Sequence, residues 1–218
     1  MTPKAVVLMV FGMALAATAA AQQVDTHQHR FGDADKWSQV FDDPKRDATQ
    51  KPHEVIKALA LAPDALVADI GSGTGYFAVR LAHAVPKGRV YGVDVEPAMV
   101  KHLAERAKRE KIVNLTSLAG TPGDARLPEK VDLALIVDVY HHIDQREGYL
   151  RRLAGSLKRG GRVAVIDFRP DARSGPPKGE RIAAERVKAE FKSAGFAVAQ
   201  EHDFLPEQYF IVFRRAKE

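Results

Sequence analysis

The chain alternates between continuous apolar runs and apolar stripes at helical spacing. Continuous runs predict buried strands, and stripes with apolar residues three and four positions apart predict helices. We expect Gly160 and Gly161 to end the helix before the fifth strand, and Gly195 to end the last helix. The runs cover residues 65–70, 89–95, 115–118, 131–137 and 162–168, and the stripes cover residues 55–60, 77–85, 99–107, 149–157 and 187–194.

The order of these elements indicates the fold class. Strands that alternate with helices of this length form βαβ units, which build a parallel sheet covered by helices on both faces. Beyond residue 195 the alternation stops, and residues 196–204 and 208–213 are predicted to be two strands joined by a short turn. We therefore predict an α/β fold, with a doubly wound, seven-stranded, mostly parallel sheet and an antiparallel C-terminal hairpin.

The first fifty residues differ from the rest of the chain. Lys4, the uncharged apolar residues 5–17 and the small residues 18–21 follow the pattern of a secretory signal peptide. We predict that residues 1–21 are removed and that the protein is exported to the periplasm without stable membrane insertion. An uncleaved N-terminal membrane anchor is the alternative. Residues 22–50 then form a polar extension, and residues 51–218 form the main domain.

Composition narrows the possible functions. The 218 residues include no cysteine, which excludes disulfides, thiolate zinc sites and cysteine nucleophiles. The net charge is +5, but Lys and Arg are spread along the chain and are not interleaved with aromatic residues, so we expect no nucleic-acid partner. His27 and His29 lie in the polar extension, where no rigid element would fix metal ligands, and we expect no metal site.

A glycine loop between the first strand and the next helix carries the main chemical signal. It reads Asp69-Ile70-Gly71-Ser72-Gly73-Thr74-Gly75. A cofactor lying across the carboxyl edge of a parallel sheet touches the backbone of this turn, and side chains in place of the glycines would hold it away. The loop alone predicts a nucleotide-type cofactor, because nicotinamide and flavin sites use related loops.

Two acidic residues make this prediction more specific. Asp69 directly precedes the glycines, where its carboxylate would attract the amino group of a methionine moiety and repel a dinucleotide pyrophosphate. Asp94 ends the second strand, 19 residues after Gly75, and is placed to accept hydrogen bonds from both ribose hydroxyls.

Five segments resemble the class I S-adenosylmethionine-dependent methyltransferases, and the resemblance spans roughly residues 51–213. It implies S-adenosylmethionine as the cofactor and a strand order of 3-2-1-4-5-7-6, with the terminal hairpin as the family's added antiparallel strand. The five segments are VADIGSGTGYF (67–77), VYGVDVEP (90–97), GDARLP (123–128), VDLALIVDVYHHI (131–143) and LKRGGRVAVIDF (157–168).

The same resemblance implies a set of cofactor contacts. Asp124 would lie near the adenine amine, although residues 120–123 lengthen the usual link from the third strand. Met99 is either an apolar lid for the adenine or a core residue. The implied contacts are Asp69, Gly71, Ser72, Gly73, Gly75, Asp94, Val95, Asp124 and Asp138.

Candidate catalytic residues follow the fourth strand. The methyl group of a sulfonium is already activated, so an enzyme mainly aligns the acceptor and excludes water. Asp138 and His141 are candidates for acceptor contact or for base catalysis, and packing at the start of the next helix is the alternative for His141. Asp167 is a further candidate carboxylate at the mouth of the site. The extension with Trp37, Arg46 and Gln50 is a candidate lid over the cofactor.

Three functions fit these observations. The first is a methyltransferase for a small-molecule acceptor, which the short chain favours because it leaves few insertions to grip a macromolecule. The second is a non-catalytic S-adenosylmethionine-binding protein. The third is a nicotinamide-dependent oxidoreductase, which Asp69 and the terminal hairpin disfavour. The predicted export conflicts with a cofactor made in the cytoplasm, and this conflict stays open.

Overall fold

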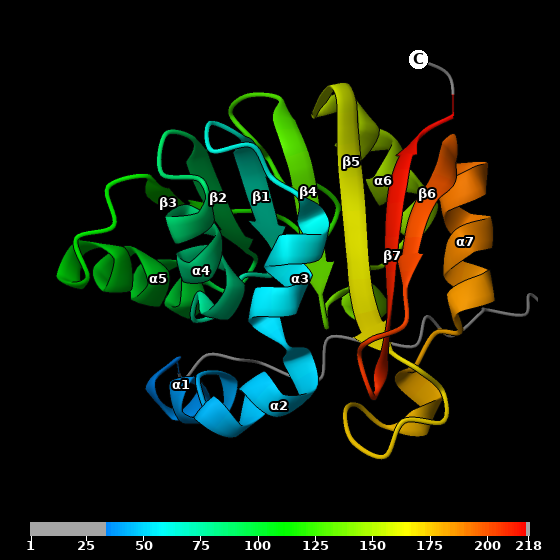
Figure 1. Ribbon diagram of the computed structural model, residues 1–218, viewed down its shortest axis with the longest axis horizontal. Helices are drawn as coiled ribbons and strands as arrows, with labels where there is room; N and C mark the ends of the chain where they lie inside the picture. Colours follow the sequence, from blue (N-terminus) through cyan, green and yellow to red (C-terminus); the bar gives the residue numbers. More distant parts are fainter. Residues whose placement is uncertain (1–33, 217–218) are drawn as a thin grey trace, which may run out of the picture.

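The computed structural model describes residues 34–216 and contains one seven-stranded sheet in the order β3-β2-β1-β4-β5-β7-β6 (Figure 1). This confirms the predicted fold class and strand order. Every pairing from β3 across to β5 is parallel. The strands are β1 (Leu66–Ile70), β2 (Arg89–Asp94), β3 (Leu115–Ala119), β4 (Val131–Val137), β5 (Leu157–Phe168), β6 (Phe196–His202) and β7 (Gln208–Arg215).

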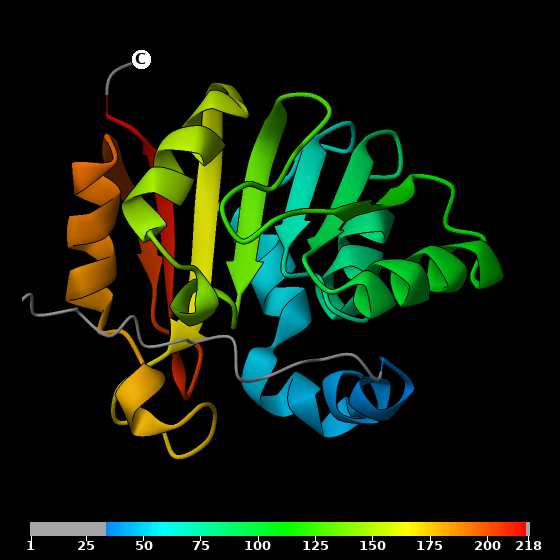
Figure 2. The same ribbon diagram turned by 180° about the vertical axis from the view of Figure 1, so that it is seen from behind.

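Helices cover both faces of the sheet, as the buried apolar clusters show. One cluster joins the sheet to α3, α4 and α5, and the other joins it to α6 and α7, which lie in front of the sheet in Figure 2. Because both faces are covered, the central strands read as continuous apolar runs. These helices are α3 (Pro52–Leu59), α4 (Tyr76–Ala84), α5 (Pro97–Arg109), α6 (Arg146–Gly155) and α7 (Ala184–Ser193).

The boundary between α6 and β5 differs from the prediction. The helix ends at Gly155, and Leu157 is already a fully buried strand residue. Gly160 and Gly161 lie inside β5, where the pairing with β4 shifts register, and Gly160 has a φ of 73°. A Cβ on Gly161 would lie 3.0 Å from the carbonyl oxygen of Val131. The glycines therefore form an irregularity in the strand and do not end the helix.

The C-terminal hairpin is present as predicted. β7 runs antiparallel to both β5 and β6, so it is the one strand that begins at the edge where the parallel strands end. Gln208, its first residue, pairs with Phe168 near the end of β5. The hairpin thus brings a residue late in the sequence to the carboxyl edge.

A short helical segment lies below the carboxyl ends of β1, β2 and β4 (Figures 1 and 2). It consists of α1 (Ala34–Phe41), the 3₁₀ turn η1 (Pro44–Arg46) and α2 (Asp47–Gln50), and we call residues 34–50 the cover. The predicted signal peptide and the His27–His29 pair lie outside the described residues. Within residues 34–216, we find no helix long and apolar enough to cross a membrane.

Candidate functional site

The buried polar residues of the described chain gather at the carboxyl edge of the sheet. Each lies near the end of a parallel strand, in the glycine loop, at the start of β7, or in the cover. Burying polar groups costs free energy unless they find partners, so their concentration indicates a binding site and not ordinary packing. They are Gln50, Asp69, Ser72, Thr74, Asp94, Asp167 and Gln208.

The glycine loop links β1 to α4 through left-handed conformations. Gly71 and Gly75 have φ of 70° and 95°. A Cβ on Gly71 would lie 2.3 Å from Cγ2 of Val139, and one on Gly75 would lie 2.4 Å from Cδ1 of Leu103. Two of the three glycines are therefore required by the packing of the protein itself, in addition to any cofactor.

Gly73, with a φ of 51°, faces the cover. Its added Cβ would meet the ring of Phe41 at 3.6 Å. Its N–H donates to Oδ2 of Asp94 at 2.8 Å, and Oδ1 of Asp94 accepts from the N–H of Glu96 at 2.9 Å. A carboxylate offers about four lone-pair positions, so Asp94 keeps acceptor capacity for a ligand beside these backbone donors.

Asp69 and Asp94 are both almost fully buried. Burial raises the pKa of Asp69 to about 7, the nearby Asp94 charge adds to the rise, and a hydrogen bond from the Ala78 N–H opposes it. Burial also raises the pKa of Asp94, against backbone hydrogen bonds that stabilise its charge. Two close, buried carboxylates favour a cationic ligand at this end of the sheet.

The other predicted cofactor contacts lie around Asp94. Val95, which follows it, is half exposed. Its side chain is therefore available to pack against a flat ring of a ligand. Asp124 is half-buried, and its Oδ1 accepts from the N–H of Arg126 at 2.8 Å within a tight turn. Met99 is 1% exposed, so the core alternative holds for this residue in the structure.

Asp138 holds together segments far apart in the sequence. It follows β4 with a φ of 57°, a strained conformation for a residue with a Cβ. Its Oδ2 accepts from Nε2 of Gln50 at 2.6 Å and from Nη2 of Arg46 at 3.2 Å, and its Oδ1 accepts from Nε2 of Gln208. Burial raises its pKa to about 6, although Arg46 opposes the rise.

His141 and Asp167 form a second buried pair. Nδ1 of His141 lies 2.9 Å from the Asp167 carboxylate, and the His141 N–H donates to Asp167 Oδ2 at 3.2 Å. The His141 side chain is 3% exposed. Its burial lowers the pKa, but the hydrogen bond and charge of Asp167 outweigh this and raise it overall. Asp167 thus fixes the ring and supports its protonation.

The cover is attached to the glycine loop at two further points. Nη1 of Arg106 bridges Asp42 of the cover, at 2.9 Å, and the carbonyl oxygen of Thr74, at 3.0 Å. Asp47 accepts a hydrogen bond from the Tyr76 hydroxyl. The cover is therefore bound to the first turn of α4 as well as to Asp138.

Several buried polar atoms without hydrogen-bond partners fit a binding site for S-adenosylmethionine. Ser72 Oγ, Thr74 Oγ1 and Gln50 Oε1 are buried without a hydrogen-bond partner. All three lie in the glycine loop or in the cover beside it, where a ligand with several donors and acceptors would pair them. In the sequence-based prediction, Asp69 would supply the anion for an amino group, and Asp94 would supply acceptors for ribose hydroxyls.

Comparisons with known proteins agree with this geometry. A family model described as a methyltransferase domain matches residues 68–163, from β1 into β5. The crystal structure of a SAM-dependent methyltransferase from Aquifex aeolicus is 26% identical, with a TM-score of 0.78, over 83% of this chain and 97% of that one. The chain carries a class I S-adenosylmethionine-dependent methyltransferase domain. The matched residues include Asp69, Asp94 and Asp138, and the cover lies before them.

Two curated relatives extend the comparison of the methyltransferase domain. Demethylmenaquinone methyltransferase of Tropheryma whipplei (strain Twist) is 33% identical over 113 residues, which are 51% of this chain and 45% of that protein. Release factor glutamine methyltransferase of Cereibacter sphaeroides is 31% identical over 137 residues, which are 62% of this chain and 48% of that protein. The chain spans about half the length of the curated relatives it matches.

Sequence reasoning missed two polar residues at the carboxyl edge of the sheet. Gln208 was assigned only as a strand residue, yet it binds Asp138. Tyr209 lies beside Asp167 in the β5–β7 pairing, and its hydroxyl is buried without a partner. Burial, and then the charge of Asp167, raise its pKa. A polar pair opening the otherwise apolar strand 208–213 was the signal available.

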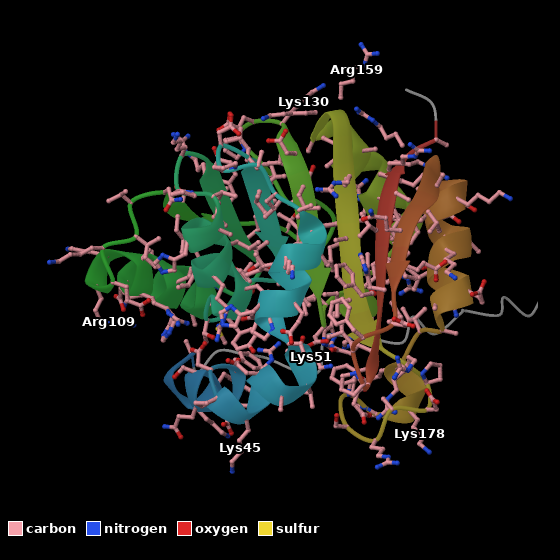
Figure 3. The ribbon with its side chains drawn as sticks, viewed as in Figure 1. Lys45, Lys51, Arg109, Lys130, Arg159 and Lys178 are labelled. Atoms are coloured by element: carbon pink, nitrogen blue, oxygen red, sulfur yellow. The ribbon has the colours of Figure 1, made fainter. Side chains whose placement is uncertain are left out.

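Charged side chains away from the carboxyl edge are dispersed over the molecule. Figure 3 shows Lys130 and Arg159 at the amino edge, Lys45 and Lys178 at the opposite end, and Arg109 at the far end of α5. In residues 34–216 we find no group of three or more His, Asp or Glu side chains arranged to hold a metal ion. The sequence-based prediction for His27 and His29 stays a prediction.

Proposed function

We propose that the protein is an S-adenosylmethionine-dependent methyltransferase that acts on a small-molecule acceptor. One observation carries the proposal: Asp69 and Asp94 flank a glycine loop with three positive-φ glycines, at the carboxyl edge of the methyltransferase domain. The demethylmenaquinone relative supports a small acceptor, whereas the release factor relative supports a protein acceptor. The short described domain favours the small molecule.

The residues of the edge divide the work of such a reaction. Asp94 would hold the ribose, Asp69 the amino group, and the glycine loop the backbone side of the cofactor. The cofactor supplies an activated methyl group when bound. The cover excludes water from the edge, which favours transfer to the acceptor over hydrolysis.

His141 is the residue best placed to take a proton from an acceptor. Asp167 occupies Nδ1, so Nε2 is the nitrogen left to act as a base. A base whose pKa lies near the working pH balances availability against strength, and the Asp167 charge raises the pKa of His141 from 6.5. An acceptor that ionises only weakly at neutral pH, such as a hydroxyl, would need this base.

Calorimetry tests the cofactor assignment. We expect S-adenosylmethionine and its demethylated product to bind and NAD not to bind. Binding of NAD with no binding of S-adenosylmethionine would contradict the proposal in favour of an oxidoreductase.

Turnover separates an enzyme from a non-catalytic binding protein. The purified protein would be incubated with S-adenosylmethionine and separate panels of small hydroxylated aromatic compounds, small carboxylic acids and protein substrates. We expect release of demethylated cofactor with a small molecule. Binding without release in every panel would support a sensor.

We also propose that residues 1–21 direct export, on the basis of the signal-peptide pattern alone. A reporter active only outside the cytoplasm, fused after Gln22, tests this by cell fractionation. Reporter activity in the soluble periplasmic fraction is expected. Activity in the membrane fraction would indicate an anchor, and absence of activity would place the enzyme in the cytoplasm.

A further inference from the structure

Arg46 is a cation of the cover that contacts Asp138 and Tyr76 at the carboxyl edge. Its Cζ lies 4.3 Å from the centre of the Tyr76 ring, directly after the glycine loop. Its Nη1 donates to the carbonyl oxygen of Phe41 at 3.0 Å, and its Nη2 donates to Asp138. The guanidinium is therefore held in a fixed direction between the cover, the first turn of α4 and the end of β4.

The charge of Arg46 acts on both strand-end carboxylates nearest to it. It opposes the burial that raises the pKa of Asp69, and it opposes the same effect at Asp138. The guanidinium thus lies within electrostatic reach of the ends of both β1 and β4. Its side chain is 22% exposed, so solvent screens this interaction only partly.

Gln50 adds an unpaired acceptor at the same place. Its Nε2 donates to Asp138, which fixes the orientation of the amide, because a carboxylate accepts and does not donate. Its Oε1 is left without a partner although the residue is only 3% exposed. A buried carbonyl oxygen without a donor is destabilising, and a ligand N–H would pair it.

These groups together match the two ends of an α-amino acid. A guanidinium binds a carboxylate through paired N–H donors, and an ammonium group needs several acceptors of which at least one is charged. Arg46 provides the former, while Asp69 and the Gln50 oxygen provide the latter. S-adenosylmethionine and its demethylated product carry this α-amino-acid end, and methylthioadenosine lacks it.

We propose that the cover is part of the cofactor site, with Arg46 binding the carboxylate and Gln50 the amino group of the methionine end. This inference rests on the proposed function, because it takes S-adenosylmethionine as the ligand. Both residues precede the segment that the methyltransferase family model matches, so the contact is supplied by this chain's own extension.

Calorimetry with two ligands tests the inference on the full chain. The demethylated cofactor has the amino-acid end, and methylthioadenosine provides the adenosine and sulfur without it. We expect Arg46→Ala to weaken binding of the demethylated cofactor at least tenfold, which is about 1.4 kcal/mol, and to leave methylthioadenosine within about twofold of wild type. Gln50→Ala should weaken the demethylated cofactor alone, by about fivefold.

Arg80→Ala is the matched control. The Arg80 guanidinium stacks on the same Tyr76 ring, with its Cζ at 4.1 Å from the ring centre, and pairs with Asp47 of the cover at 3.2 Å. Its loss loosens the cover as the loss of Arg46 would, and within the described residues its hydrogen bonds go to Tyr76 and Asp47 and not to Asp138. We expect both ligands to bind this variant within about twofold of wild type.

The outcomes distinguish the inference from the proposed function. Equal losses for both ligands in Arg46→Ala and Arg80→Ala would overturn the inference, because the cover would then act only by general packing. Unchanged binding of the demethylated cofactor to Arg46→Ala would overturn it too, while the methyltransferase proposal would stand. A wild-type protein that binds neither ligand would overturn both. Arg46→Lys, which keeps the charge and the aliphatic stem, provides a folded variant with an intermediate loss if Arg46→Ala does not fold.

Discussion

The two halves of the carboxyl edge satisfy their polar groups in different ways. At the end of β2, Asp94 accepts hydrogen bonds from backbone N–H groups of residues close in sequence or in the adjoining loop. Beyond β4, Asp138 accepts from three side chains that come from the cover and from β7. The polar site at the end of β2 is thus built locally, whereas the site after β4 is held by contacts between distant segments.

This difference explains what the sequence could predict. The glycine loop and Asp94 are defined by short-range spacing, and the buried strands by continuous apolar runs, so both were readable from one chain. The partners of Asp138 lie 88 residues before it and 70 residues after it, and no local pattern links them. The extension predicted as a lid includes Arg46 and Gln50, but their common partner, Asp138, became known only from the structure.

The predicted position of the α6–β5 boundary was wrong for a related reason. Leu157 continues the helical spacing of the preceding leucines, and Gly160-Gly161 is a strong local signal for a helix end. Pairing with β4 outweighs that signal, because it buries Leu157 completely and uses the glycines at a point of close backbone approach. Tertiary contacts decide such boundaries, and a single sequence does not display them.

The largest expected effect on stability is at Gly71, where the loop after β1 contacts Val139 after β4. In Gly71→Ala, the added methyl group meets Val139 at 2.3 Å, in a backbone conformation with a φ of 70°. We expect a loss of about 3 kcal/mol in the free energy of unfolding, because overpacking and left-handed strain add. Urea denaturation measures this.

Gly155→Ala is the control for that variant, since it adds a methyl group at the end of α6 with no atom within 4 Å. It should raise the free energy of unfolding by up to about 1 kcal/mol, because alanine is favoured over glycine in a helix. Equal losses in the two variants would contradict the packing role of Gly71.

The next effect is the dependence of stability on pH that the buried Asp138 carboxylate causes. The folded pKa of Asp138 is raised to about 6, above the value of 3.8 expected in an unfolded chain. The folded state therefore binds more protons than the unfolded state in this window, and stability falls as pH rises from about 4 to about 6. We expect Asp138→Asn to remove a fall of the order of 2 kcal/mol, measured by denaturation across that range.

Both proteins retain Asp69, so any fall that this residue causes is common to them and cancels in the comparison. If the free energy of unfolding depends on pH in the same way in the wild type and in Asp138→Asn, then Arg46 and the two glutamines compensate the Asp138 charge completely.

A smaller effect concerns ligand affinity at the end of β2. Asp94→Ala should weaken binding of S-adenosylmethionine by at least about tenfold, or 1.4 kcal/mol, because the ribose hydroxyls lose both acceptors. Asp124→Ala should weaken it less, since Asp124 also holds its own turn through Arg126. Calorimetry provides both values, and unchanged affinity in Asp94→Ala would remove the ribose assignment.

The smallest effect is expected at the rim of the cover. Asp42 is 27% exposed where it pairs with Arg106, and partly exposed ion pairs contribute little. Asp42→Ala should lower the free energy of unfolding by less than about 1 kcal/mol. A loss well above about 1 kcal/mol would show that the Asp42–Arg106 pair contributes more to attaching the cover than a partly exposed ion pair does.

The bonds to Asp138 also have a consequence for how the protein is made. Gln50 and Arg46 leave the ribosome early, and Gln208 leaves it only after most of the chain has been synthesised. Until then, the carboxylate after β4 lacks one of its partners, and β5 lacks its neighbour on the β7 side. Domains generally fold as units. The hydrogen-bonded cluster around Asp138 is therefore completed only when the last strand has been synthesised.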